Sequence, residues 1–159
     1  WETKYKVNAA GVVPVSENRV FISSGYKRGC SVIEVKRGRP RTVWENKEMQ
    51  AHWSTPIFVD GYLYGIGDPG FLMCLDPKDG STTWKQEGFE KGGLIGIDGH
   101  IIAADGKRGD IMLVELTPEA YRERGRIKPL GGQTWPAPIV ADGRLIVRNK
   151  EKLAVIDLR

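Results

Sequence analysis

The sequence repeats itself with a period of about forty residues. Each of four segments has an apolar run, then Asn or Asp, in three cases Gly, and then a second apolar run. An Asp-Gly pair between apolar runs is typical of a β-hairpin, because both turn residues tolerate a positive φ. The turn residues are Asn18, Asp60, Asp98 and Asp142, at spacings of 42, 38 and 44 residues.

Two further strands are expected after each hairpin. In the first two copies a turn leads from the third strand to a tryptophan, Trp44 or Trp84. The third copy differs, because Thr117 and Pro118 form a pattern typical of a helix start, which predicts about one helical turn near 118–122. In every copy the third strand ends in an acid, and we expect these acids to accept hydrogen bonds from backbone donors at a turn or blade junction. They are Glu34, Asp76, Glu115 and Asp157.

Four strands per period of about forty residues is the pattern of a β-propeller blade. The sequence therefore predicts an all-β propeller of four four-stranded antiparallel blades, either as a closed four-blade ring or as half of an eight-blade ring. The blades are expected at about 8–47, 48–87, 88–130 and 131–159, with residues 1–7 completing the last one. The expected strands lie near 11–15, 19–24, 30–36, 42–47, 54–59, 62–66, 71–76, 82–86, 93–97, 100–104, 110–116, 126–129, 137–141, 144–148 and 152–157.

The half ring is the favoured alternative. Inner runs such as Ile57-Phe58-Val59 are bulky for the narrow channel of a four-blade ring. A half ring would either belong to a longer chain or pair with a second copy as a homodimer, which would leave no exposed sheet edge.

The composition fits this architecture and argues against several other classes of protein. Twenty glycines and nine prolines indicate many turns and little helix. No apolar run approaches the ~18 residues of a membrane-spanning helix. The net charge is +4, and basic groups such as the one at 36–41 are typical of solvated turns, so nucleic-acid binding is not expected. Cys30 and Cys74 lie in apolar runs without metal-ligand spacing, and we expect small buried hydrophobes there.

The second copy resembles a known repeat. Its stretch from Cys74 to Trp84 is similar to the tryptophan-docking repeat of quinoprotein (PQQ-like) β-propellers, whose pattern is Ala-x-Asp-x-x-x-Gly-x-x-x-Trp. Asp76, Gly80 and Trp84 match this pattern, and Cys74 replaces the alanine. The first copy retains Glu34, Gly38 and Trp44, with two extra residues.

The resemblance implies a structural role for the repeated residues. In that family the tryptophan packs on an adjoining blade, and rings normally have about eight blades, of which this chain would supply four. The residues to which the resemblance assigns this docking role are Trp1, Trp44 and Trp84, with Gly38, Gly80 and Asp76.

Candidate binding residues lie where the copies differ, at the entry to the innermost strand. The equivalent positions hold Gly11, Trp53, Lys91 and Trp135. In a four-blade ring the two tryptophans would face each other across the channel, where they could stack a flat ring or receive a side chain of a partner. They could equally fill the channel as core. The candidate binding residues at this channel face are His52, Trp53, Lys91, Gln133 and Trp135.

The resemblance leaves two classes of function open. The quinoprotein dehydrogenases use PQQ with a calcium or lanthanide ion held by Glu, Asn and Asp, a catalytic Asp, and usually a disulfide between adjacent cysteines. This chain has no Cys-Cys pair, and we expect no catalytic residue, no metal and no PQQ. The favoured function is a non-catalytic scaffold whose channel-face loops bind a protein or polysaccharide partner. The alternative is a fragment of a PQQ-dependent dehydrogenase whose cofactor site lies in other blades. A periplasmic or extracellular location is implied by the resemblance alone.

Overall fold

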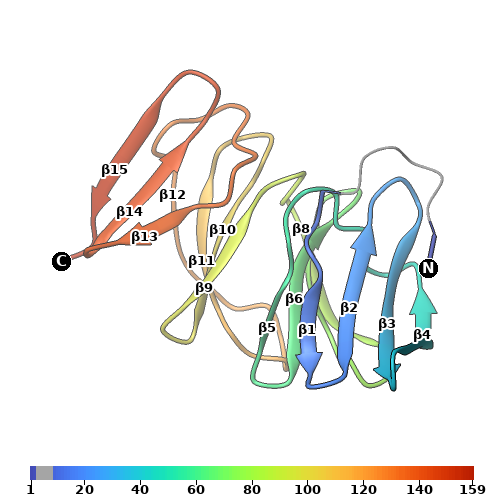
Figure 1. The fold of residues 1–159 in the computed structure, drawn as a ribbon. Helices are drawn as coiled ribbons and strands as arrows, with labels where there is room; N and C mark the ends of the chain where they lie inside the picture. Colours follow the sequence, from blue (N-terminus) through green and yellow to red (C-terminus); the bar gives the residue numbers. More distant parts are fainter. Residues whose placement is uncertain (3–8) are drawn as a thin grey trace.

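The computed structural model describes residues 1–2 and 9–159, which form fifteen strands in four antiparallel sheets (Figure 1). Blade 1 contains β1 (Val13–Ser16), β2 (Arg19–Ser24), β3 (Gly29–Lys36) and β4 (Arg39–Asn46). Blade 2 contains β5 (Ile57–Val59), β6 (Tyr62–Gly67), β7 (Phe71–Leu75) and β8 (Thr82–Glu87). Blade 3 contains β9 (Leu94–Ile97), β10 (His100–Ala104), β11 (Ile111–Glu115) and β12 (Glu123–Ile127). Blade 4 contains β13 (Ile139–Ala141), β14 (Arg144–Arg148) and β15 (Leu153–Asp157).

The strands of each blade are paired in chain order, as expected for propeller blades. The turn between the first two strands adopts the predicted hairpin conformation in blades 2, 3 and 4. At Asp60 and Gly61, for example, φ is 48° and 84°. Two successive positive φ angles match the right-handed twist of the flanking strands, and this is why Asp-Gly recurs there. Each expected strand is therefore confirmed, with boundaries shifted by a few residues.

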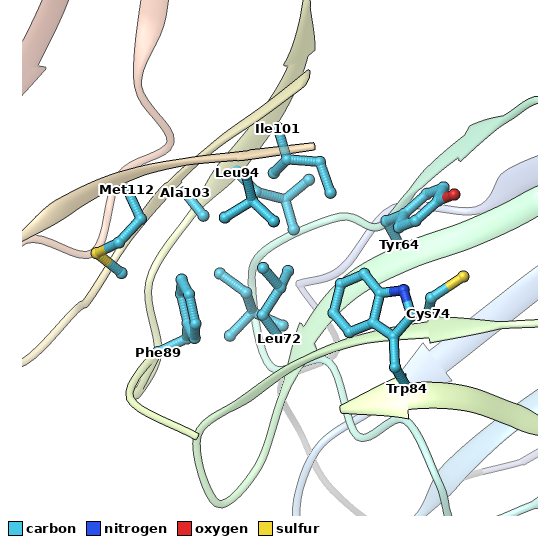
Figure 2. Packing of buried hydrophobic residues seen from close by; sticks show 11 residues of the cluster. Tyr64, Leu72, Cys74, Trp84, Phe89, Leu94, Ile101, Ala103 and Met112 are labelled. Atoms are coloured by element: carbon cyan, nitrogen blue, oxygen red, sulfur yellow. The ribbon is translucent and has the colours of Figure 1, made fainter. Parts of the chain in front are cut away.

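Three apolar clusters hold the blades together, one at each junction. Successive side chains of a central strand point to opposite faces, so that Leu63 of β6 packs towards blade 1 and Tyr64 towards blade 3. Figure 2 shows the cluster between blades 2 and 3, where Leu72 and Trp84 lie opposite Leu94. Each fully buried large side chain contributes about 1.5–3 kcal/mol to this packing, and the blades are held face to face mainly by these side chains.

One local prediction was wrong. Residues 116–122 contain a bend at Pro118 and Glu119 but no helical turn, and β12 begins three residues earlier than expected. The Glu115 N–H donates to the Arg122 carbonyl oxygen at 3.0 Å. This bond pairs the two ends of the segment between β11 and β12 in the manner of neighbouring strands. The Thr117 carbonyl oxygen accepts a bond from the Trp84 indole of blade 2. These long-range bonds hold the segment extended, so the helix-start signature of Pro118 is overridden.

The four blades form an open arc. Blade 1 and blade 4 lie at its opposite ends, and so do the two ends of the chain (Figure 1). Among the described residues β15 pairs only with β14. Most of the predicted completing strand 1–7, namely residues 3–7, lies outside the described residues. Trp1 lies against blade 1, where the Arg28 guanidinium carbon is 4.0 Å from its ring centroid. The arc matches the half-ring interpretation, not the four-blade ring.

The outer face of blade 4 is apolar and exposed. Ile139, Ile146 and Val155 form a row across its three strands, and Ile139 and Val155 are 58% and 55% exposed. The described part of the chain contains no helical segment with the length and apolar character that crossing a bilayer requires.

Candidate functional site

The blade topology gathers one set of loops at one face of the arc, which is formed by the same end of every blade. In each blade, the entry to the innermost strand lies at the same end as the turn between the second and third strands, because neighbouring strands are antiparallel. The entries of blades 1 and 2 are directly linked, since the Gly11 N–H donates to Thr55 Oγ1 at 2.8 Å. All five candidate binding residues lie at this end.

A continuous run of aromatic rings crosses these loops. Tyr26 contacts His52 at a centroid distance of 4.4 Å, and His52 meets Trp53 edge-on at 4.0 Å. Trp53 stacks on Trp135, with 4.8 Å between centroids and 34° between ring planes. Trp53 is half-buried, whereas Trp135 is 36% exposed. We refer to the Trp53–Trp135 pair as the indole platform.

The two tryptophans do not face each other across a channel, as a four-blade ring would require. They come from blades 2 and 4, and both reach over the entry to blade 3 until they touch.

Two ammonium groups lie beside the platform. Lys91 Nζ is 5.6 Å from the Trp53 centroid and 5.9 Å from the Trp135 centroid, and Lys150 Nζ is 5.9 Å from the Trp135 centroid. These distances are within the range of cation–π attraction. Among the described residues, neither lysine has a carboxylate within ion-pairing distance, whereas nearby Lys107 is paired with Glu90 at 3.3 Å.

The backbone fixes the position of Lys91. Its φ is 51°, a left-handed conformation that costs free energy for a residue with a side chain. The two following glycines permit very close approaches, because a Cβ on Gly92 would lie 1.7 Å from the Ala104 carbonyl oxygen and a Cβ on Gly93 would lie 2.3 Å from the Ala137 Cα. The entry to blade 3 is thus pressed against its own β10 and against blade 4.

Two buried polar atoms of the site lack partners. Within the described part of the chain, His52 Nδ1 and Trp53 Nε1 make no hydrogen bond. His52 is 8% exposed, and its burial lowers the pKa of the imidazole, while the charge of Asp68 raises this pKa and that of Lys91 lowers it further. The net shift keeps His52 neutral at neutral pH, so it supports Trp53 without adding charge.

Hollows lie on both sides of Trp135. A cleft of about 400 Å³ is lined by Trp53, Ser54, Thr55, Gly93, Leu94, Trp135, Pro136 and Ala137. A second hollow of about 370 Å³ is lined by Glu90, Lys91, Gly106, Lys107, Gln133 and Trp135. Both volumes are at the lower end of those of small-molecule sites, and Trp135 is the wall between them.

Two residues that contribute to the site, Tyr26 and Lys150, were not predicted from the sequence. Both lie in turns between the second and third strands, at the same face of the arc as the strand entries. Aligning those turns across the copies, in addition to the strand entries, is the signal that would have found them.

The two blade-linking tryptophans lie away from this site. Trp44 Nε1 donates to the Pro77 carbonyl oxygen at 2.7 Å, and Trp84 Nε1 donates to the Thr117 carbonyl oxygen at 2.8 Å. A Cβ on Gly80 would lie 2.7 Å from the Trp44 ring, so glycine leaves the space that the ring occupies.

The acids at the ends of the third strands fall into two groups. Asp76 Oδ1 accepts the Lys78 N–H at 2.8 Å and Asp157 Oδ1 accepts the Arg159 N–H at 3.0 Å, both as expected. The expectation was wrong for the other two, because their carboxylates pair with basic side chains. Glu34 contacts Arg19, Lys36 and Arg41, and Glu115 contacts Arg122 and Arg124.

The residues present do not fit the cation–PQQ pair of the quinoprotein dehydrogenases. Within residues 1–2 and 9–159, no three His, Cys, Asp or Glu side chains come together in a way that could hold a metal ion. Lys91 and Lys150 each lie within 6 Å of an indole centroid of the platform and would repel a divalent cation.

Comparison with protein families gave one match. Residues 4–86, just over half of the chain, match the model described as "Outer membrane protein assembly factor BamB". A search of curated protein sequences gave no significant match.

Solved structures share the fold. The crystal structure of BamB from Moraxella catarrhalis matches with a TM-score of 0.69 and 18% identity, over 94% of this chain and 46% of that chain. The Citrobacter koseri AztD structure gives a TM-score of 0.60 and 18% identity, over 95% of this chain and 44% of that chain. A europium-containing methanol dehydrogenase gives 0.59 and 11% identity, over 82% of this chain and 27% of that chain. The chain spans less than half the length of each of these structures.

Proposed function

Because the chain belongs to the PQQ-like β-propeller repeat family that includes the assembly factor BamB, we propose that it is a non-catalytic scaffold that binds a protein or carbohydrate partner at the indole platform. The observation that carries this proposal is the stack of Trp53 on Trp135, with Trp135 36% exposed between two hollows. Buried aromatic residues mostly serve packing, but an exposed indole held rigidly by a second indole is typical of a binding surface.

The remaining tryptophans have a different role in this proposal. Trp44 and Trp84 dock each blade on the next one, supported by Gly38, Gly80 and Asp76, as the family resemblance implies. The blade boundaries near 47, 87 and 130 and the half-ring organisation are part of the same proposal. Trp1 contacts Arg28 of blade 1, and its docking role belongs to the same proposal.

A dehydrogenase fragment is the second candidate. It is favoured by the shared fold with a europium-containing methanol dehydrogenase and by an indole face able to stack a flat ring. It needs a cation site from residues other than the described ones, because those do not form one.

Arrays of defined oligosaccharides and of defined peptides test the proposal. Labelled protein is applied beside the Trp135→Ala variant and beside Trp1→Ala, a matched control that removes a tryptophan of nearly equal exposure, 37%, at the opposite end of the arc. We expect ligands that retain the parent protein and Trp1→Ala but release Trp135→Ala. If every retained ligand is retained equally by Trp135→Ala, or none is retained at all, the proposal is wrong.

The second candidate is tested by adding PQQ and calcium to the chain. We expect no change in the melting temperature and no reduction of an artificial electron acceptor by added alcohols. A rise of several degrees that needs both PQQ and calcium would support the dehydrogenase fragment, because selective binding to the native state stabilises it.

A further inference from the structure

We propose that the indole platform binds an acidic oligosaccharide, one built from uronic acid units whose carboxylates pair with Lys91 and Lys150. This inference rests on the proposed function and names the chemistry of its ligand. It is carried by the combination of a flat exposed indole with two ammonium groups that have no carboxylate partner in the described part of the chain.

The exposed face of Trp135 suits a sugar ring. One face of a pyranose ring presents C–H groups, which are apolar and slightly positive, and the face of an indole is apolar and slightly negative. Trp135 offers such a face, and its stacking on Trp53 fixes the orientation of the ring before any ligand binds. A platform that is already ordered loses little side-chain entropy on binding.

The two ammonium groups beside the platform suit an acidic sugar. Lys91 and Lys150 each place Nζ over the Trp135 ring, 5.9 Å from its centroid, which is within reach of a sugar ring bound against that indole. The carboxylate of a uronic acid projects from the rim of its ring, so it would meet these ammonium groups in a charge-assisted hydrogen bond. Of the acids nearby, Glu90 is paired with Lys107 and Asp105 lies 3.9 Å from Arg108. Asp68 and Glu151 also lie close, but neither is within ion-pairing distance of Lys91 or Lys150.

The strained backbone of Lys91 is the third observation. Its φ of 51° is left-handed, a conformation that costs less free energy at a glycine than at a lysine. Glycines occupy the next two positions, but the strained position itself is a lysine. This conformation, together with the close packing of Gly92 and Gly93, sets Lys91 over both indoles.

The shape of the site favours a chain of sugar units over a peptide. Hollows of about 400 and 370 Å³ lie on either side of Trp135, which suits successive units of one chain. The Thr55 Oγ1 accepts the Gly11 N–H, so its own proton is directed elsewhere and can bond a sugar hydroxyl. A peptide of comparable affinity would need a deep apolar pocket for an anchoring side chain, and both hollows contain polar groups such as Ser54 and Gln133.

The experiment compares two ligands with the same sugar chain, one with free carboxylates and one with neutral methyl esters. A galacturonate oligosaccharide and its fully methyl-esterified form are titrated into the protein, and binding is followed by calorimetry and by tryptophan fluorescence. We expect the acidic form to bind at least about tenfold more tightly, since esterification removes the partners of two lysines. A mannuronate oligosaccharide tests whether the sugar stereochemistry matters.

Variants locate the site. Lys91→Gln and Lys150→Gln should each weaken binding of the acidic ligand by about threefold to fivefold, as expected for partly exposed ion pairs. Trp135→Ala should weaken it by about tenfold or more, because it removes the surface on which the ring stacks. Lys78→Gln is the matched control, since it removes one positive charge from an exposed turn at the other end of blade 2 and should change nothing.

Three outcomes overturn the inference. Equal affinity for the acidic and esterified forms would show that the carboxylates of the ligand do not contribute to binding. An equal loss in Lys78→Gln and Lys150→Gln would show attraction to net charge alone. Binding of a neutral oligosaccharide or of a peptide that depends on Trp135, without binding of either uronate, would refute the acidic ligand while leaving the proposed function intact. Circular dichroism of each variant confirms that it is folded.

Discussion

The indole N–H of Trp84 donates a hydrogen bond to the carbonyl oxygen of Thr117, 2.8 Å away in the next blade. Trp44 makes the same bond to Pro77, again 33 residues further along the chain. Two consecutive blade junctions are therefore closed by the same contact between a fourth strand and the residues that follow the third strand of the next blade. This repetition makes the contact a target for measurement.

Trp84→Ala should unfold or nearly unfold the chain. Truncating a buried aromatic side chain typically costs ~3–5 kcal/mol, a large share of the ~5–15 kcal/mol that stabilises a domain. Trp84→Phe should cost less, about 1–3 kcal/mol, mainly because the Thr117 carbonyl oxygen loses its donor. Urea denaturation of both variants measures these losses, with Trp135→Ala as the control at an exposed indole. A Trp84→Ala protein with the stability of the parent would refute the docking role.

Gly80→Ala should destabilise the protein more than Gly38→Ala. Both glycines have positive φ angles, 79° and 72°, so alanine is strained at either position by about 1–2 kcal/mol. A Cβ at Gly80 would also lie 2.7 Å from the Trp44 ring, whereas nothing lies within 4 Å of a Cβ at Gly38. The clash should add about 1–3 kcal/mol. Equal losses in thermal or urea denaturation would mean that the Trp44 ring moves away freely.

Protonation of Glu34 should destabilise the fold in acid. Hydrogen bonds from Lys36, Arg41 and Arg19 hold its pKa at about 2, below the usual glutamate value. A lowered pKa means that the folded state prefers the carboxylate, so its contribution is complete above the usual pKa and is lost as the pH falls to about 2. Glu34→Gln should lower the stability at neutral pH and flatten its dependence on pH over that interval. The exposed Glu17→Gln serves as control, and an unchanged acid profile in Glu34→Gln would contradict this prediction.

Neither cysteine should react while the protein is folded. Cys30 and Cys74 are fully buried, and burial raises the pKa of both thiols, that of Cys30 to about 12. The reactive thiolate is therefore scarce and inaccessible. Alkylation followed by mass spectrometry should find no adduct under native conditions and two adducts in denaturant. Rapid labelling of either thiol in the native protein would mean that its sheet opens.

The strands were predictable because the turns are encoded locally. Asp60-Gly61 and its equivalents fix where each hairpin reverses, and the apolar runs between turns have the period of a buried sheet. The prediction of a helical turn near Pro118 was wrong because contacts with other strands outweighed the local signal. Its signal was also local, but bonds to Trp84 and within the blade 3 sheet decided the conformation.

The sequence predicted which strand-entry residues would lie at one face of the propeller, but it did not predict which of them touch. The repeat alignment identified Trp53, Lys91 and Trp135 as the positions where the copies differ. That the two indoles touch depends on how far each blade turns from the last, which is a property of the whole arc and has no signature in a short segment. Lys150 was missed because the strand entries were aligned across the copies and the turns between second and third strands were not. The packing of the blades then places its ammonium group 5.9 Å from the Trp135 centroid.

The blade junctions also rank the parts of the molecule by how readily they open. β8 and β4 each carry a tryptophan that grips the following blade, whereas β12 has none in its sequence Glu-Arg-Gly-Arg-Ile, and blade 4 has an exposed outer face. In a stacked array each unit is held only by its neighbours, and local opening begins at the weakest junction. Amide hydrogens of β14 and β15 should exchange with solvent well before those of β6 and β7. Local unfolding would then begin in blade 4 and reach the other blades later.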